Sequence, residues 1–319
     1  MPPSSSPPSV AAHQASRWLA VDPEVGAALD AAAPVVALES TIVTHGMPWP
    51  ANFETARSVE DTVRAHGAVP ATIAVMEGRI RVGLRPAELE ALARDPHARK
   101  LSRRDLAAAL AGGWRGGTTV AATMLCADRA GIRVFATGGI GGVHRGGETS
   151  MDVSADLDEL ARTPVAVVCA GCKAILDIPR TLEVLETHGV PVIGLGCDEL
   201  PAFYSRRSGC PAPLRLDTPE QVAALMHAQW DLGLRGGVLV ANPVPEADAM
   251  DPDQIEQVIA QALAEAESRG VTGKDVTPFL LARVAELTGE ASLRTNIALV
   301  KHNARLAAEI ARAFQRPRH

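Results

Sequence analysis

Several features that would point to a protein class are scarce or missing in this chain of 319 residues. Aromatic side chains make up 3% of it, so the core has to be built from Ala, Val, Leu and Ile. The net charge is −6, which leaves no overall basic field for nucleic acid or an anionic membrane. No run approaches the roughly 18 apolar residues of a membrane span. We therefore expect a protein that binds neither nucleic acid nor a membrane, and that would need local Arg, Lys or backbone amides to bind an anionic small molecule.

The cysteines do not form the pattern of a disulfide framework. There are five, an odd number, and several lie in apolar runs, which favours buried thiols in a reducing compartment. Cys169 and Cys172 have CxxC spacing, but no second CxxC or CxxH accompanies them, so core packing is favoured over a redox or metal role. Residues 1–16 predict a disordered Pro/Ser tail without the apolar segment of a signal peptide. We expect a cytoplasmic protein with a single domain over residues 17–319.

Apolar strands alternate with helical patterns along the chain. Strands are predicted over 34–40, 132–137, 164–171, 190–197 and 237–243, and two strands joined by a Glu-Gly turn over 71–83. A short helix is expected over 17–33, a helix capped by Asn52 or its neighbour up to Gly67, and terminal helices over 252–269, 278–287 and 291–315. This alternation predicts an α/β fold, a mostly parallel sheet between two layers of helices, with a helical C-terminus packed on the same domain.

One lysine stands out because lysine is rare here. Four of the 31 basic residues are lysines, and Lys173 follows the apolar run 164–171 by two residues. Its ammonium group is therefore expected just beyond the carboxyl end of a buried strand, where open α/β sheets bind ligands. Unlike Arg, Lys can lose its proton and form an imine. The local sequence alone favours a reactive lysine and an ordinary surface lysine equally.

Three other stretches carry groups that suit a ligand site. Glu39 ends an apolar strand, so it is either a general acid or base or a cap on backbone amides. Lys100 precedes Ser102 and Asp105 at a helix start, which suits either a bound phosphate or a solvated charge cluster. The glycine-rich run 137–147 suits an anion-binding loop or a plain connection, because it lacks the spacing of a dinucleotide or P-loop motif.

Two further patterns carry oxygen and amide groups. Asp152, Ser154 and Asp156 stand at alternate positions, where they would either hold a hard divalent cation with waters or cap the helix that follows. Asn296 and Asn303 are seven residues apart and share a helix face. Such amides either bind a ligand or hydrogen-bond a loop.

Together these stretches resemble the pseudouridine-5′-phosphate glycosidase family. The resemblance spans about residues 34 to 312 and rests on long runs in the same order, over 37–52, 70–84, 100–107, 116–146, 151–157, 167–194, 203–209 and 292–304. It implies an α/β/α fold, a homotrimer and a divalent metal, typically Mn²⁺. It also implies reversible cleavage of the C–C glycosidic bond of pseudouridine 5′-phosphate to uracil and ribose 5-phosphate, in pseudouridine catabolism.

Roles follow from the resemblance position by position. Lys173 would be the imine-forming nucleophile, Glu39 the acid and Asp152 the metal ligand. The residues expected to contact substrate are Lys100, Val120 through its backbone, Ser154, Ala155 and Asp156. Those expected near the ribose phosphate or the base are Thr137, His144 and Asn296.

The reaction implied by the resemblance needs a lysine that can form an imine. Uracil is attached through carbon, a poor leaving group, and an iminium at C1′ supplies the electron sink that allows this bond to break. Glu39 would protonate the ring oxygen as the sugar opens. The amine of Lys173 must react uncharged, which burial or a neighbouring cation such as Lys100 favours. Two alternatives remain: a Schiff-base aldolase or other sugar-phosphate lyase, and a non-catalytic sugar-phosphate-binding protein.

Overall fold

The molecule is built on one large sheet. The computed structural model describes residues 17–271, 273 and 276–316, so the predicted disordered tail over 1–16 lies outside the described residues. In the part described, eleven strands form the main sheet. Their order is β1 (Leu19–Val21), β4 (Arg79–Val82), β3 (Val69–Met76), β2 (Val35–Leu38), β7 (Val134–Ala136), β9 (Ala166–Cys169), β13 (Val238–Ala241), β11 (Val192–Leu195) and β12 (Leu214–Leu216), with β6 (Gly116–Thr118) and β5 (Arg99–Leu101) branching from β3.

Most neighbouring strands run parallel, as predicted. The antiparallel pairs of this sheet are β3 with β4 and β3 with β6. The central strands β2, β7, β9 and β13 are apolar and buried along their whole length. Strands read as continuous apolar runs when helices cover both faces of a parallel sheet. Their carboxyl ends therefore meet at one edge, which is where a ligand site is expected.

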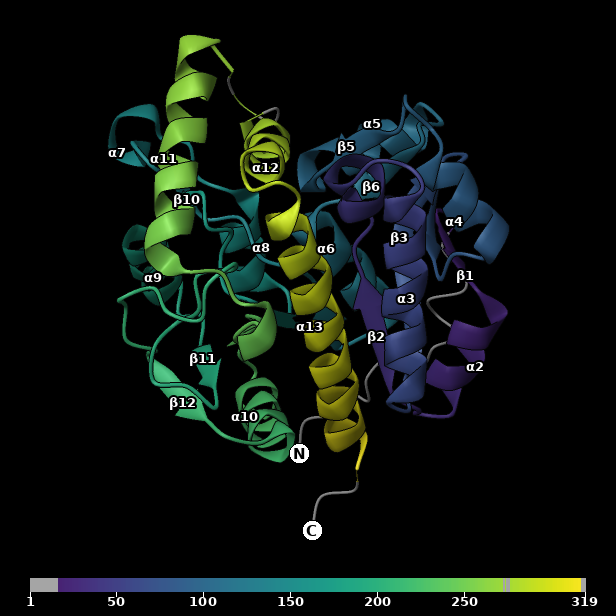
Figure 1. Cartoon of the computed structure of the whole chain (residues 1–319). Helices are drawn as coiled ribbons and strands as arrows, with labels where there is room; N and C mark the ends of the chain where they lie inside the picture. Colours follow the sequence, from purple (N-terminus) through teal and green to yellow (C-terminus); the bar gives the residue numbers. More distant parts are fainter. Residues whose placement is uncertain (1–16, 272, 274–275, 317–319) are drawn as a thin grey trace.

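Helices cover both faces of the sheet (Figure 1). The long helix α13 (Ala291–Gln315) packs on β2, β7 and β9, with α3 (Ala51–Ala65) and α10 (Pro219–Asp231) on its two sides. Behind the sheet lie α6 (Val120–Ala130) and α8 (Ala155–Arg162), which contact each other. The α/β/α prediction is thus confirmed, and the helical C-terminus packs directly on the sheet.

The remaining helices surround these layers. Two of them form the end of the domain next to α13: α11 (Pro252–Ser268) and α12 (Val276–Leu287). The others, with two single turns that matter below, are α2 (Pro23–Asp30), α4 (Pro86–Ala93), α5 (Leu106–Ala111), α7 (Gly147–Ser150), α9 (Ile178–Thr187), the π-helical turn η1 (Ile42–Gly46) and the 3₁₀ turn η2 (Arg103–Asp105). A short antiparallel pair joins β8 (Val143–His144) to β10 (Leu176–Asp177).

The predicted tight turn between two strands is confirmed, because its residue types are typical of such turns. Glu77 and Gly78 both have positive φ, 52° and 70°, which makes the tight turn between β3 and β4. The helix predicted over 17–33 is partly wrong, because Leu19–Val21 form β1, which pairs with the distant β4. Asn52 does not cap α3, whose N-cap is Pro50. Its buried amide instead donates to the carbonyls of Val43 and Ala93.

Candidate active site

Three of the predicted residues come together at the carboxyl edge of the sheet. Glu39 follows β2, Lys173 follows β9, and Lys100 lies on β5. All three line a cleft of about 660 Å³ and also an adjoining chamber of about 60 Å³. The cleft continues along the N-terminus of α6 and the start of α8, and the chamber continues toward α12 and α13. Residues distant in sequence thus share one site, which a single sugar phosphate could span.

Glu39 is held in a setting that favours its protonated form. The hydroxyl of Thr137 donates a hydrogen bond to its carboxylate. The pKa of Glu39 is raised from its ordinary value because burial disfavours the charged form, although the positive charge of Lys173 and the bond from Thr137 oppose this. A carboxyl group that keeps its proton to higher pH is suited to act as a general acid.

Lys173 is placed by a close contact between two loops. Its backbone N–H donates to the carbonyl of Ile140 at 3.0 Å, and the N–H of Ile140 donates to the carbonyl of Gly171 at 3.1 Å. Gly171 has φ of 85°, and a Cβ there would stand 2.4 Å from the carbonyl oxygen of Pro201. Only glycine fits beside Pro201. The two hydrogen bonds with Ile140 hold the loop that carries Lys173 against the glycine-rich run. The half-buried side chain then lines both the cleft and the chamber.

The two site lysines act on the same neighbours. The pKa of His144 is lowered from its ordinary value, because burial disfavours the imidazolium and because Lys100 and Lys173 add positive charge, while Asp152 opposes them. Both lysines also act on Glu39. The expectation that Lys100 lies beside Lys173 agrees with this arrangement. Clustered cations suit an anionic substrate.

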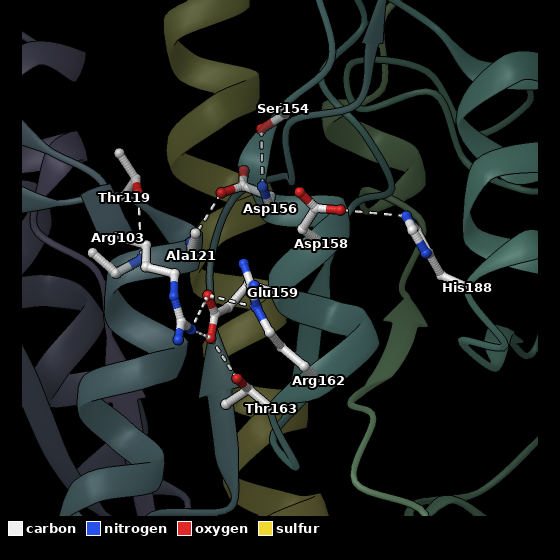
Figure 2. A network of polar contacts seen from close by, with 11 residues as sticks. Arg103, Thr119, Ala121, Ser154, Asp156, Asp158, Glu159, Arg162, Thr163 and His188 are labelled. Carbon is white, nitrogen blue, oxygen red and sulfur yellow. Dashed lines mark hydrogen bonds and ion pairs between the residues drawn. The ribbon is translucent and has the colours of Figure 1, made fainter. Parts of the chain in front are cut away.

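Asp156 ties two walls of the cleft together. One carboxylate oxygen accepts the N–H of Ala121 at 2.9 Å and the other accepts the N–H of Gly141 at 2.8 Å. Figure 2 shows Asp156 reaching the start of α6 in this way. Val120, the first residue of α6, therefore lines the cleft beside the glycine-rich run. The positive end of α6 is directed at the cleft, where it favours an anion.

Ser154 caps α8. Helix capping and metal binding were the two roles predicted for this segment. Its side chain accepts the N–H of Asp156 at 3.2 Å, and α8 begins at Ala155. Ser154, Ala155 and Asp156 all line the cleft. The motif therefore presents its backbone and short side chains to a ligand, while Asp156 uses both oxygens on backbone amides.

Asp152 is the residue with which the chain could hold a metal. Its half-exposed carboxylate lines the cleft, with the Nδ1 of His144 3.9 Å away. No group of three or more His, Cys, Asp or Glu side chains suited to a metal occurs among the described residues. One carboxylate in a cleft of about 660 Å³ fits a hard cation such as Mn²⁺ or Mg²⁺, which keeps several waters, and it does not fit a structural zinc site.

Asn303 hydrogen-bonds a loop, which is one of the two roles predicted for it, whereas the ligand-binding role of Asn296 stays a prediction. Asn296 lines the chamber. Asn303, fully buried two turns further along α13, donates to the carbonyl of Thr137 at 2.9 Å and accepts from Asn242 at 3.0 Å. The second amide thus holds the strand-end turn whose Thr137 contacts Glu39. Thr137 itself is buried behind that carboxylate rather than in the cleft wall.

Some residues at the site carried no role in the sequence prediction. The chamber and the cleft share Thr41 and Thr277, and the chamber also contains His45 and Phe203. Thr41, His45 and Phe203 stand inside runs that carry the family resemblance, which is the signal that could have marked them. Thr277 stands outside those runs, and only the packing of α12 brings it to the site.

The two cysteines with CxxC spacing are part of the core, which is the role that the sequence favoured over a redox or metal site. Cys169 and Cys172 are buried free thiols, and burial raises the pKa of each to about 12. A thiol that resists ionisation is a poor nucleophile and metal ligand. Lys173 therefore stays the candidate nucleophile of this segment.

Comparison with known proteins agrees with the geometry. A family model described as indigoidine synthase A like protein matches residues 24–313. The pseudouridine-5′-phosphate glycosidase of Methylobacterium nodulans is 66% identical over 293 residues, which cover 92% of this chain and 87% of that protein. The enzyme of the same name from Solibacter usitatus is 61% identical over 297 residues, covering 93% and 99%.

Solved structures share the whole fold. The prealnumycin C-glycosynthase AlnA, solved in complex with ribulose 5-phosphate, superposes with a TM-score of 0.87 at 41% identity, covering 94% of this chain and 98% of that one. An indigoidine synthase A-like protein from Thermotoga maritima superposes with a TM-score of 0.85 at 36% identity, covering 94% and 97%. This chain therefore belongs to the indigoidine synthase A-like family, among the pseudouridine-5′-phosphate glycosidases.

Proposed function

We propose that this enzyme reversibly cleaves the C–C glycosidic bond of pseudouridine 5′-phosphate, giving uracil and ribose 5-phosphate. The observation that carries the proposal is the meeting of Lys173, Lys100 and the proton-holding Glu39 around one cavity. The relatives that bear this name match over nearly the whole chain. The solved complex with ribulose 5-phosphate supports a pentose phosphate as ligand.

The site residues would carry out the reaction in successive steps, in which bonds are formed and broken and protons are transferred. The uncharged amine of Lys173 attacks C1′ and displaces the ring oxygen, which takes the proton of Glu39 and leaves as a hydroxyl. The nitrogen, which carries a positive charge after the attack, loses one proton and so regains its lone pair. That lone pair forms a C=N bond as the bond from C1′ to uracil breaks, and the released carbon of uracil takes up the proton that the nitrogen gave off. Water hydrolyses the iminium to ribose 5-phosphate and the free amine.

The larger cleft supplies groups suited to the phosphate. Lys100 and the N-terminus of α6 lie on its walls, and both favour an anion. The chamber on the other side of Lys173, which contains Asn296 and Phe203, suits a planar polar base. Lys173 lies between the two, where C1′ of such a substrate would be.

Asp152 is proposed as the protein ligand of a divalent cation, typically Mn²⁺. When bound, the ion would offset the negative charge of the substrate. Asp152→Asn is expected to weaken binding of Mn²⁺, measured by electron paramagnetic resonance without substrate. Wild-type affinity in that variant would count against this assignment.

A homotrimer in the cytoplasm is also proposed. The five cysteines are all free, as a reducing compartment requires. Within the described part of the chain, no helix combines the length and apolar character needed to cross a membrane. Sedimentation equilibrium tests the trimer, and a monomeric mass would refute it.

The decisive experiment follows synthesis from uracil and ribose 5-phosphate by ultraviolet absorbance, with and without Mn²⁺. Lys173→Ala and Lys173→Arg are expected to lose turnover, because neither can form the imine. Lys301→Ala, which removes a lysine from α13, is the matched control and should keep it. Borohydride should trap a ribose 5-phosphate adduct on Lys173, located by peptide mass.

The outcomes separate the alternatives. Release of an aldehyde without uracil would favour an aldolase, and binding of ribose 5-phosphate without synthesis in either metal arm would favour a binding protein. A Lys173→Arg variant at the wild-type rate would rule out the imine.

A further inference from the structure

A second, smaller cavity lies behind Glu39. Its volume is about 30 Å³, and it shares Glu39, Ile42 and Gly138 with the chamber in front. The rest of its wall comes from the sheet and from α3 and α13, through Leu38, Thr55, Ala56, Val59, Thr72, Ala136, Thr137 and Val300. The carboxyl group of Glu39 thus faces the substrate chamber on one side and this rear cavity on the other.

The rear cavity has the volume to hold one water, and Thr55, Thr72 and Glu39 are among the residues that line its mostly apolar wall. A buried water needs roughly 10–15 Å³ of such space and two to four polar partners. Thr55 is 5% exposed, lines this cavity, and forms no hydrogen bond within the described residues. Helical threonines commonly bond to the preceding turn, as Thr62 does to Ser58 at 2.7 Å. The hydroxyl of Thr55 is therefore left to a molecule in the cavity.

Thr72 connects the cavity to a second carboxyl group. Thr72 lines the cavity, and its hydroxyl donates to Oε1 of Glu60 on α3 at 2.5 Å. The pKa of Glu60 is raised from its ordinary value because burial disfavours the carboxylate, although the bond from Thr72 and the charges of Arg64 and Arg57 oppose this. Glu60 is half-buried, so it also contacts solvent outside the active site. It can therefore take up protons from solvent and hold them.

We propose that Glu60, Thr72 and water in the rear cavity form a proton path that recharges Glu39 from behind. This rests on the proposed function, in which Glu39 gives up one proton as the ring oxygen leaves. A substrate that fills both the chamber and the cleft lies between Glu39 and the bulk water on that side. Glu60 then donates to the oxygen of Thr72, Thr72 gives its own proton to the cavity water, and that water protonates Glu39. Each group loses one proton and gains one, and Glu60 is restored from solvent.

Three variants interrupt the path, and Thr62→Val and Thr72→Ser, which keeps the hydroxyl, are controls. Thr72→Val keeps the shape and the β-branch of a buried strand residue but removes the hydroxyl, and Glu60→Gln removes the acid. Ala56→Val fills the cavity without touching either group. Thr62→Val is the matched control, since it also deletes a hydroxyl associated with α3 but lies outside the cavity wall. Steady-state rates of uracil release are measured in H₂O and in D₂O, with circular dichroism to check folding.

The first three variants are expected to lower kcat about tenfold at unchanged KM, a small part of the roughly 10²- to 10⁴-fold that general acid–base catalysis contributes. They should also raise the solvent isotope effect on kcat, because proton supply becomes limiting. Thr72→Ser and Thr62→Val should match the wild type. Wild-type kcat and isotope effect in Thr72→Val and Ala56→Val would overturn the path, as would an equal loss in Thr62→Val. An inactive wild-type enzyme would instead refute the proposed function.

Discussion

Removal of Arg103 should unfold the protein more easily, because it would leave a carboxylate buried without its main partner. Glu159 on α8 has a side chain with 0% exposure. Both of its oxygens accept from Nη1 of Arg103, at 2.6 and 2.7 Å, and the hydroxyl of Thr163 also donates to it (Figure 2). Arg103 belongs to η2, close after Lys100, so this ion pair anchors the lysine's segment to the helix behind the sheet.

The size of the effect follows from what remains around Glu159. Breaking a buried ion pair by removing one partner costs about 3–5 kcal/mol. Arg162 stays 3.6 Å from the carboxylate and compensates in part, so Arg103→Ala should fall at the lower end, about 3 kcal/mol. For a domain of this length the unfolding entropy converts this to a drop in Tm of about 5 °C.

The assay is thermal and urea denaturation of the wild type, Arg103→Ala, Glu159→Gln and the double variant. In the double variant the charge is gone, so most of the loss should be recovered. KM for ribose 5-phosphate should rise in Arg103→Ala, because the segment of Lys100 loses its anchor. A loss below about 1 kcal/mol, or a double variant as unstable as Arg103→Ala, would show that the pair does not have the role given to it.

Two further predictions concern proton and thiol chemistry. Thr137→Val removes a hydrogen bond that favours the charged form of Glu39, so the pKa of Glu39 should rise further. A general acid works while protonated, and the alkaline limb of the kcat profile should therefore move to higher pH, whereas an unmoved limb would exclude Glu39 as the acid. In the native protein a thiol reagent should modify only the half-buried cysteines. Absorbance and peptide mass measure this modification, and fast reaction of the other cysteines would contradict their burial. The half-buried thiols are Cys197 and Cys210, and the protected ones are Cys126, Cys169 and Cys172.

Short-range chemistry explains which parts of the fold the sequence predicts. The Glu-Gly turn and the three C-terminal helices follow from turn residues and apolar periodicity, which act between neighbours in the chain. The strand at Leu19–Val21 was missed because its three residues take an extended form only through pairing with β4, some sixty residues away. Local propensity carries no information about such a partner.

The functional site, like the fold, could be predicted from the sequence only in part. The scarcity of lysine, the preceding strand and the family pattern together identified Lys173. The family pattern also identified Glu39, Lys100 and Asp152. Residue types and their place at strand ends left a reactive and an ordinary role equally open for Lys173 and Glu39, and the family resemblance supplied the prediction of a lysine nucleophile beside an acid.

Only the tertiary structure decided how these groups are supported. It placed Thr137 behind Glu39 rather than in the cleft wall, and assigned Asn303 to a turn and Asn296 to a chamber. It buried Glu159 against Arg103, and opened a small cavity between Glu39 and the Thr72–Glu60 pair. These contacts join segments tens to more than a hundred residues apart. Their strength depends on burial and distance, which arise only when the strands and helices have packed.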